Sequence, residues 1–542
     1  MDIWSWICEL PNSDEWNQSN SQLTFTLASS TPIPNKTNYS SQYQSIQLRA
    51  ERTSQLEVDD LICFSVYLVG FNDDEKKAVW ASDACPLSSE TPFLPLVLQL
   101  LQEIVSRSPT AQDSTCPRSQ LQRLKPEPVS WILDSHSPES FSGFFNLVFL
   151  TRLFWICACD APADVGSFFF RSLLAPNIET FACRHAPVLR NFLVAVGTDV
   201  ELCFMRTFGY MLAKWLILRD VEVGLRSLTP LPSKNLGFSY AVESHGLWVL
   251  KGYAPVKSMQ CMQSQGQKCI FPAVIEAKES LLKYALAHQQ LEAVIQLEYT
   301  VQFHENFIQV NARVDNLRIH VATLGFKKDI VNSDEDNFLN EKHFPSRIRV
   351  WVGPEVGASY VGGLSLGRST DNVEREMEMQ KTLKGSSGKL KKAPKVKAMA
   401  RMATKSKIKN WRWDQDVDGN AAIFDATLCD NTTGVEIATW KPPRGGGGGG
   451  EIGLNLRRRY IGNGRPFTKS GGLIFAGEEY GEGVGWRVSK EMEGSVLKWR
   501  IGGQVWLSYW PNHVTTSYYE TRCIEWCDEV DLPLLPSKIT IS

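Results

Sequence analysis

The stretch that decides the fold reads Ile295-Gln-Leu-Glu-Tyr-Thr-Val-Gln-Phe-His304-Glu-Asn-Phe-Ile-Gln-Val-Asn-Ala-Arg-Val-Asp315. Apolar and polar side chains alternate along both arms, and a polar turn at 304–306 separates the arms. Successive side chains of a strand point to opposite faces of its sheet, so this alternation is typical of a strand with one buried face. The stretch therefore predicts a half-buried antiparallel hairpin.

The C-terminal half repeats this period of two. One run alternates from Ile348 to Val352, and another runs from Leu497 through Gly502-Gly503 to Tyr509. The Gly-Gly pair is typical of a two-residue hairpin turn. Many strands without helices between them predict a β-sandwich or an open barrel. A six-glycine run at 445–450 predicts a flexible loop within this half.

The N-terminal half has a mixed pattern. Residues 20–82 contain short runs that predict strands, and residues 92–107 switch to the period of an amphipathic helix. Residues 141–218 are mainly apolar and predict a helical layer packed on those strands. We therefore predict an α+β protein with four segments: an α+β domain at 1–228, the first part of a β domain at 236–380, a basic disordered insertion at 381–412, and the second part of the β domain at 413–542.

Length and composition exclude several classes of protein. The chain has 542 residues, of which 43% are hydrophobic and 21% charged, with 57 Lys+Arg against 59 Asp+Glu and a net charge of −2. These values exclude a disordered chain, a collagen-like chain and a nucleic-acid binder that acts through bulk charge. The length predicts about two to four domains.

The composition of the N-terminus, the spacing of the cysteines and the length of the apolar run predict the compartment. The N-terminus begins Met1-Asp2-Ile3-Trp4, with an early acid and no long apolar run, which is atypical of a secretory signal. The 13 cysteines include no CxxC motif, which favours free thiols in a reducing compartment. Residues 144–159 are shorter than the roughly 20 apolar residues that cross a bilayer, so we expect a buried helix and no transmembrane segment. The expected location is cytoplasmic or nuclear.

One acidic run has the spacing of a calcium-binding loop. Its candidate ligands alternate and surround a glycine, as in an EF-hand, where carboxylates converge on a hard cation. However, the twelfth position is an aspartate rather than a bidentate glutamate, and the residues after the run predict a strand rather than a helix. The alternatives are a calcium loop of another geometry and a solvated acidic turn before a strand. We expect no other cofactor. The candidate ligands are Asp414, Asp416, Asp418, Asn420 and Asp425.

The predicted insertion at 381–412 holds twelve basic residues and no acidic one. Such a run could be a nuclear localisation signal, an arm that binds nucleic acid or anionic lipid, or a solvated segment without a partner. Partners other than proteins are therefore expected only through this segment. The candidate anion-binding residues are Lys389, Lys391, Lys392, Lys395 and Lys397.

Two further patterns could carry function. Gly363-Leu-Ser365-Leu-Gly367 matches the nucleophile elbow of a hydrolase, and His513 is the only downstream histidine. The charged segment after the motif and the absence of strand–helix repeats argue against a hydrolase. The C-terminal tryptophans could line an apolar or sugar-stacking groove or could pack between two sheets. These are Trp486, Trp499, Trp506, Trp510 and Trp526.

Part of the C-terminal third resembles a family of plant proteins of unknown function. The resemblance rests on Arg465-Pro-Phe-Thr-Lys-Ser-Gly-Gly-Leu-Ile-Phe-Ala-Gly-Glu-Glu-Tyr480, on Trp486-Arg-Val and on Trp506-Leu-Ser-Tyr-Trp-Pro-Asn512, and it extends over about 340–535. It implies a plant source and a soluble β-rich domain, but no activity, cofactor or catalytic residue. We therefore expect a non-catalytic binding or interaction protein. The alternatives are a hydrolase using Ser365, or targeting to the nucleus or an anionic surface through the basic segment.

Overall fold

A computed structural model describes most of both halves of the chain. The described residues are 2–11, 22–30, 43–55, 58–71, 76–108, 124–181, 187–221, 236–260, 287–324, 343–367, 375–384, 399–408, 411–429, 473–476, 483–509, 516–518 and 522–536.

The N-terminal half consists of an antiparallel sheet covered by helices. The short helix α1 (Ile3–Cys8) precedes the sheet, whose strands lie in the order β1-β2-β3-β4, with β5 paired to β3. The predicted strands in 20–82 are confirmed. The strands are β1 (Gln22–Ser29), β2 (Ser45–Gln55), β3 (Val58–Val69), β4 (Lys76–Ala81) and β5 (Cys85–Pro86).

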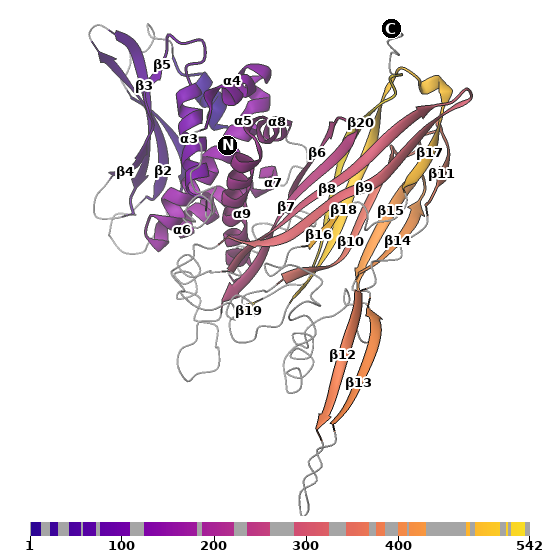
Figure 1. Cartoon of the computed structure of the whole chain (residues 1–542). Helices are drawn as coiled ribbons and strands as arrows, with labels where there is room; N and C mark the ends of the chain where they lie inside the picture. The colour runs from indigo at the N-terminus through magenta and orange to yellow at the C-terminus, as the bar shows by residue number, and fades with distance from the viewer. Residues whose placement is uncertain are drawn as a thin grey trace, which may run out of the picture.

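The helices form a layer between this sheet and the C-terminal half (Figure 1). α5 continues into the π-turn η2, and 83% of the apolar window in these two elements is buried within the molecule. The helical elements are α3 (Leu94–Ser106), α4 (Pro126–Ser135), α5 (Pro138–Phe154), η2 (Trp155–Cys159), α6 (Ala163–Phe169), η3 (Phe170–Leu174), α7 (Ala175–Phe181), α8 (Pro187–Val196) and α9 (Thr198–Val221).

The C-terminal half contains two facing antiparallel sheets, and the described strands form no closed barrel. The α+β class and the antiparallel C-terminal sheets are therefore confirmed. The eight-stranded sheet follows the path β11-β17-β9-β8-β7-β19, with β16 on β9 and β6 on β7. Its strands are β6 (Phe238–Ser244), β7 (Leu247–Gln260), β8 (Ala287–Phe303), β9 (Phe307–Thr323), β11 (Val361–Ser365), β16 (Leu473–Ala476), β17 (Val484–Ser489) and β19 (Thr516–Tyr518).

The five-stranded sheet has the order β14-β15-β10-β18-β20. Its apolar face packs on the eight-stranded sheet in one buried cluster. Its strands are β10 (His343–Pro354), β14 (Trp411–Asp418), β15 (Ala421–Leu428), β18 (Val496–Tyr509) and β20 (Arg522–Pro533), and the 3₁₀ turn η5 (Lys490–Met492) precedes β18.

The hairpin predicted at 295–315 is formed by β8 and β9. Leu297 pairs with Val314 and Val301 with Val310, so both arms place their apolar residues on the same face. That face meets the five-stranded sheet in one buried apolar cluster. The period-two pattern therefore identified both the hairpin and its core-facing side.

The Gly502-Gly503 pair is not a hairpin turn. Both glycines lie inside β18, where Gly502 pairs with Trp351 and Gly503 with Val350 of β10. A Cβ atom on Gly502 would lie 2.1 Å from two carbon atoms of the Trp351 indole. The first glycine is therefore required by a side chain that crosses the neighbouring strand, since a glycine inside a strand often marks such a close approach.

Part of the segment predicted as a disordered insertion forms strands. β12 (Arg375–Lys384) and β13 (Met399–Ile408) pair antiparallel with each other and with no other described strand. Their register sets Glu376 opposite Lys407 and Glu378 opposite Lys405. The first of these strands begins six residues before the predicted insertion.

Helix α9 is attached to the eight-stranded sheet by two buried carboxylates. The first is Glu201, which accepts hydrogen bonds from the hydroxyls of Tyr240 at 2.5 Å and Tyr253 at 2.7 Å. It also accepts one from Lys251 Nζ at 2.6 Å. A buried charge is tolerated when it is paired and fully hydrogen-bonded, as this one is.

The second carboxylate is Glu292 of β8. Arg206 of α9 donates to both of its oxygens, at 2.7 and 3.0 Å, and His320 Nε2 lies 2.7 Å from Oε2. Burial by itself would raise the pKa of Glu292, but the hydrogen bonds from His320 and Arg206 outweigh it and lower the pKa from 4.5 to about 2. The helical layer is thus held on the sheet by an ionised carboxylate.

We predict that Glu292→Gln weakens the pH dependence of stability in acid. Because the folded-state pKa is depressed, the stabilisation by Glu292 is present above about pH 4.5 and is lost as the pH falls toward about 2. It amounts to about 3 kcal/mol near neutral pH. Urea unfolding at several pH values measures the free energy of unfolding of the variant and of the unmodified protein.

Glu298→Gln is the matched control, because Glu298 pairs with Arg313 on the solvent-exposed side of the same hairpin. We expect this variant to keep the acid dependence of the unmodified protein. Equal acid dependence for the Glu292 variant and the unmodified protein would contradict the role of Glu292.

Candidate functional site

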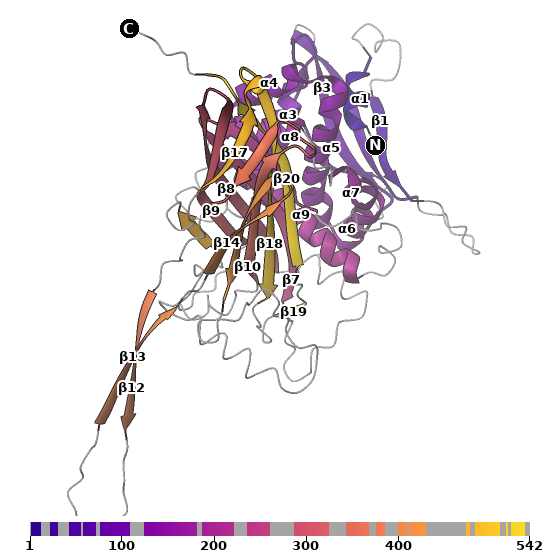
Figure 2. The same cartoon turned by 90° about the vertical axis from the view of Figure 1, so that its right-hand side faces the viewer.

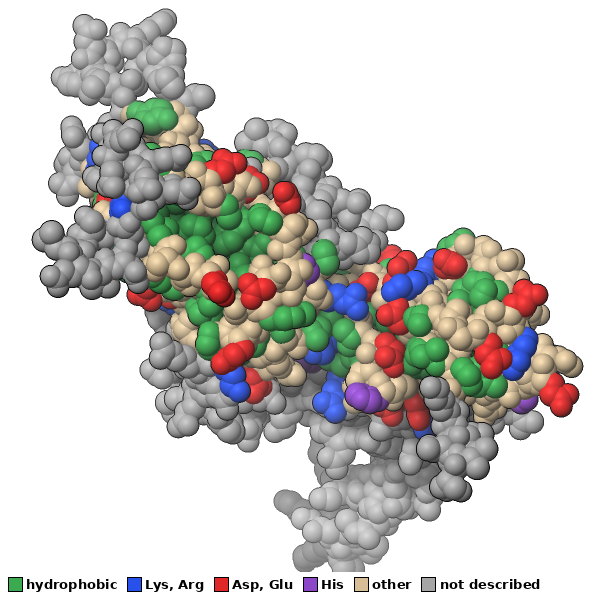
Figure 3. Space-filling view, turned by 90° about the horizontal axis from the view of Figure 1, so that it is seen from above, with side chains coloured by type: hydrophobic (Ala, Val, Ile, Leu, Met, Phe, Trp, Pro, Cys, Tyr) green, Lys and Arg blue, Asp and Glu red, His purple; other side chains and the backbone are tan. Residues whose placement is uncertain are grey.

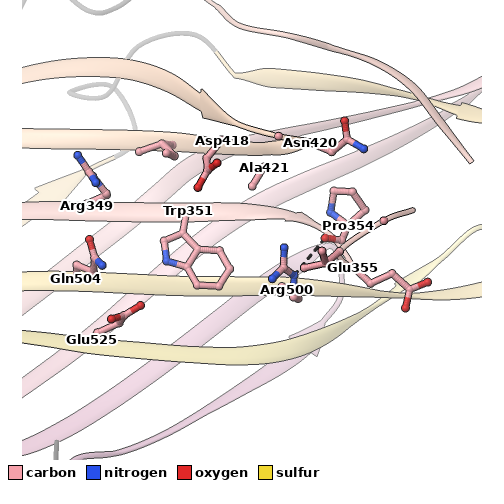
Figure 4. Close-up of a pocket in the computed structure, with 14 residues that line it drawn as sticks. Arg349, Trp351, Pro354, Glu355, Asp418, Asn420, Ala421, Arg500, Gln504 and Glu525 are labelled. Carbon is pink, nitrogen blue, oxygen red and sulfur yellow. Dashed lines mark hydrogen bonds between the residues drawn. The ribbon is translucent and has the colours of Figure 1, made fainter. Parts of the chain in front are cut away.

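A hollow of about 570 Å³ lies on the outer face of the five-stranded sheet (Figure 4). The turn after β10, at 355–357, and the β14–β15 turn, at 418–420, provide two of its sides. The remaining lining residues come from β10, β15, β18 and β20, so four adjacent strands contribute to it. The hollow therefore depends on the register of the whole sheet.

Trp351 is the largest side chain in the hollow. It is half-buried and projects from β10 across Gly502 of β18, in the space that a Cβ atom would occupy. Arg500, also on β18, places its guanidinium carbon 5.7 Å from the indole centroid and donates a hydrogen bond from Nε to the Pro354 carbonyl at 3.3 Å. These contacts from two directions hold the ring and the guanidinium in place.

The β14–β15 turn is held from inside the sandwich. Trp486 of β17, in the other sheet, donates a hydrogen bond from Nε1 to the backbone carbonyl of Asn420 at 2.8 Å. Gly419 adopts φ +62°, a left-handed conformation that glycine accommodates without steric cost. A buried tryptophan of one sheet therefore positions a side of the hollow on the opposite sheet.

Polar groups of both signs surround the indole. The lining includes the carboxylates of Glu355, Asp418 and Glu525, the amide of Gln504, and the guanidiniums of Arg349 and Arg500. The register places Gln504 between Arg349 on β10 and Glu525 on β20. Figure 4 shows these side chains spread along both sides of the indole. The hollow therefore offers hydrogen-bond donors and acceptors next to an aromatic ring.

Arg349 is already partly committed to a neighbouring ion pair. Asp425 of β15 accepts hydrogen bonds from Arg347 Nε at 2.9 Å and from Arg349 Nη2 at 2.8 Å. Partial burial tends to raise the pKa of Asp425, but the two arginines outweigh it and hold the pKa below its ordinary value of 3.8. Both guanidiniums also lie over the Trp506 ring, 5.0 and 5.9 Å from its centroid. This cluster adjoins the hollow and orients Arg349.

The structure describes all five predicted calcium ligands. They lie along the β14–β15 hairpin, and within the described ranges no group of three or more His, Cys, Asp or Glu residues could hold a metal ion. The carboxylate of Asp425 faces Arg347 and Arg349, and Asp414 accepts a hydrogen bond from Arg412. Asp418 and Asn420 instead line the hollow. The acidic spacing therefore marked a hairpin turn beside the site.

The other predicted residues lie in different places. The five candidate lysines at 389–397, and also His513 and Trp510, lie outside the described residues. Ser365 is exposed on β11 and its Oγ donates to the Gly485 carbonyl at 3.2 Å. Trp486, Trp499 and Trp526 are buried between the sheets, whereas Trp506 is half-buried on the outer face.

Sequence reasoning missed the main residues of the hollow. Neither Trp351 nor Arg500 was predicted as a site residue, although both lie within runs predicted as strands. A usable signal was present, because a large aromatic on the solvent side of one strand and a glycine on the solvent side of the next are complementary in size. Their pairing required the register between β10 and β18, which the sequence does not specify.

The comparisons with known proteins add little. No family model matches the sequence, and no curated protein matches it either. The chain is similar to the membrane-inserted form of the Clostridium perfringens NetB toxin, with 8% identity and a TM-score of 0.18, over 55% of this chain and 96% of that chain. It is also similar to Clostridium perfringens delta-toxin, with 10% identity and a TM-score of 0.20, over 54% and 96%. Likeness at these TM-scores says nothing about function.

We predict that Gly502→Ala displaces the Trp351 indole, because the added methyl group would take the space of the ring. Fluorine NMR of protein labelled with 5-fluorotryptophan measures this, with the resonance assigned by its loss in Trp351→Phe. Gly363→Ala on β11 is the control, since its Cβ would meet nothing within 4 Å. The Trp351 resonance should shift in the first variant and stay in place in the second. An unshifted resonance in Gly502→Ala would contradict the described packing.

Proposed function

We propose that this protein is a non-catalytic binding protein, and that it binds its ligand in the hollow over Trp351. The observation that carries the proposal is the indole itself, which lies half-buried in a concave site among fixed polar groups. Most small-molecule sites are concave and combine aromatic surface with a few oriented polar groups. The hollow has this combination and lies on a rigid sheet.

The described surroundings of the hollow support binding rather than chemistry. Its two arginines are engaged, one with Asp425 and the other with the Pro354 carbonyl. Its side chains orient a ligand, and the sheet beneath them is tied to the sandwich core through Trp486. Residues held in this way recognise a ligand at low entropic cost, because they are ordered before it binds.

We predict that Trp351→Ala abolishes ligand retention. Native mass spectrometry compares the protein with the variant after both are incubated with a small-molecule extract of the cells that produce it. Trp131→Ala is the control, because Trp131 is an exposed tryptophan on α4 and does not line the hollow. The adduct should be present in the protein and in the control variant and absent from Trp351→Ala. An adduct retained by Trp351→Ala, or none in any sample, would contradict the proposal.

A second candidate function is attachment to an anionic surface through the β12–β13 hairpin. The observation that favours it is the position of the hairpin, which extends away from the sandwich in both Figure 1 and Figure 2 and pairs with no other described strand. The residues that join its strands in sequence, 385–398, include the five candidate lysines. Clustered lysines are attracted to anionic lipid by about 1 kcal/mol each near the surface.

We predict that replacing these five lysines with glutamine lowers co-sedimentation with phosphatidylserine vesicles by at least about tenfold at low salt. Replacing Lys76 and Lys77, an exposed pair on β4, is the control and should leave co-sedimentation unchanged. Equal co-sedimentation of the five-lysine variant and the unmodified protein would rule out this second function. Redistribution of a fluorescent fusion of the five-lysine variant would test the same idea in cells.

A further inference from the structure

We propose that the hollow over Trp351 recognises a neutral sugar, in the form of a pyranose ring of a short oligosaccharide. This inference rests on the proposed function and specifies its ligand class. It follows from three properties of the hollow: an aromatic surface, a mixed set of hydrogen-bonding groups, and an excess of carboxylates over guanidiniums.

The aromatic surface suits the apolar face of a pyranose. The Trp351 indole cannot sink into the sheet, because the backbone of Gly502 lies beneath it. The ring therefore remains half-buried with aromatic surface available inside the hollow. The C–H groups on one face of a pyranose are weakly positive, and the face of an aromatic ring is negative, so the two surfaces attract each other.

The polar groups suit the hydroxyls of the same ring. A sugar hydroxyl donates one hydrogen bond and accepts others, so a sugar site needs both donors and acceptors around the stacking surface. Glu355 and Glu525 are acceptors, Arg500 is a donor, and Gln504 supplies both kinds of group. Figure 4 shows these four side chains on different sides of the indole, so that they can reach different edges of a stacked ring.

The charges argue against an anionic ligand. Three carboxylates line the hollow against two guanidiniums, and Arg349 is paired with Asp425, which lies beside the hollow. A phosphate or uronate would therefore meet more negative than available positive charge. Among the described side chains visible in Figure 3, acidic and basic ones are interspersed. A neutral ligand avoids this repulsion.

A purely apolar ligand fits less well. It would bury the carboxylates and the amide of the lining without replacing the hydrogen bonds they make to water, which costs free energy. The volume of about 570 Å³ is within the range of small-molecule sites. A short neutral oligosaccharide meets both conditions.

The test is a glycan array that displays neutral gluco-, galacto-, manno- and xylo-configured oligosaccharides beside uronate-containing and sulfated ones. The full chain is applied, and isothermal titration with the best neutral oligosaccharide follows. We expect binding to neutral glycans, at least about tenfold weaker binding by Trp351→Ala, and a smaller loss for Trp351→Phe, which keeps an aromatic face. Trp131→Ala, which removes an exposed tryptophan of α4 outside the hollow, should bind as the unmodified protein does, and thermal unfolding of each variant excludes loss of fold.

The possible failures are distinguishable. If neutral glycans do not bind while native mass spectrometry shows a Trp351-dependent adduct of another chemical class, the sugar inference is overturned and the binding function stands. Preference for uronate or sulfated glycans would overturn the charge argument and with it the inference. If neutral glycans bind equally to Trp351→Ala and the unmodified protein, the assignment of the sugar site to the hollow is contradicted. If neither glycan binding nor the retention of any adduct depends on Trp351, both the sugar inference and the proposed function are contradicted.

Discussion

The indole of Trp486 is the point on which the rest of the sandwich depends. It is fully buried, and its ring lies edge-on to Trp499 of the opposite sheet, with centroids 4.6 Å apart. Trp499 in turn stacks on Trp248 at 5.4 Å, which extends the aromatic contact across the core. Because the Nε1 atom of Trp486 also donates to the Asn420 carbonyl, the side chain that joins the sheets fixes a turn of the outer hollow. Loss of that hydrogen bond would leave the turn at Asn420 without its support from the core.

The helical layer constrains the sandwich from the other side. Two carboxylates, one on α9 and one on β8, face cationic and hydroxyl partners across the interface, and both are almost completely buried. Ionised groups in such a place hold two layers in one register, because any shift leaves a charge without its partner. The face of the eight-stranded sheet that α9 covers is therefore occupied, and the hollow lies on the outer face of the other sheet.

The sequence predicted more of the fold than of the site, for a physical reason. Strand alternation in 295–315 is local, so it identified the β8–β9 hairpin and its buried face. The hollow is non-local, since Trp351 and Gly502 are distant in the chain and meet only through strand pairing. The same limit produced the error at Gly502-Gly503, where a local turn signal was in fact space for an indole. The acidic run at 414–425 contains a turn at 419–420 between β14 and β15, and the carboxylate of Asp425 faces two arginines that lie outside the run.

The most direct test of the account is amide hydrogen exchange, followed by mass spectrometry, on the full chain with and without a saturating neutral oligosaccharide selected from the glycan array. A ligand stacked on Trp351 would shield the two turns that bound the hollow. The account predicts slower exchange in peptides covering 349–357 and 418–425, and unchanged exchange in β8 and β9, which lie in the other sheet. Protection confined to any other part of the chain, or none at saturation, would contradict the assignment of the hollow as the binding site.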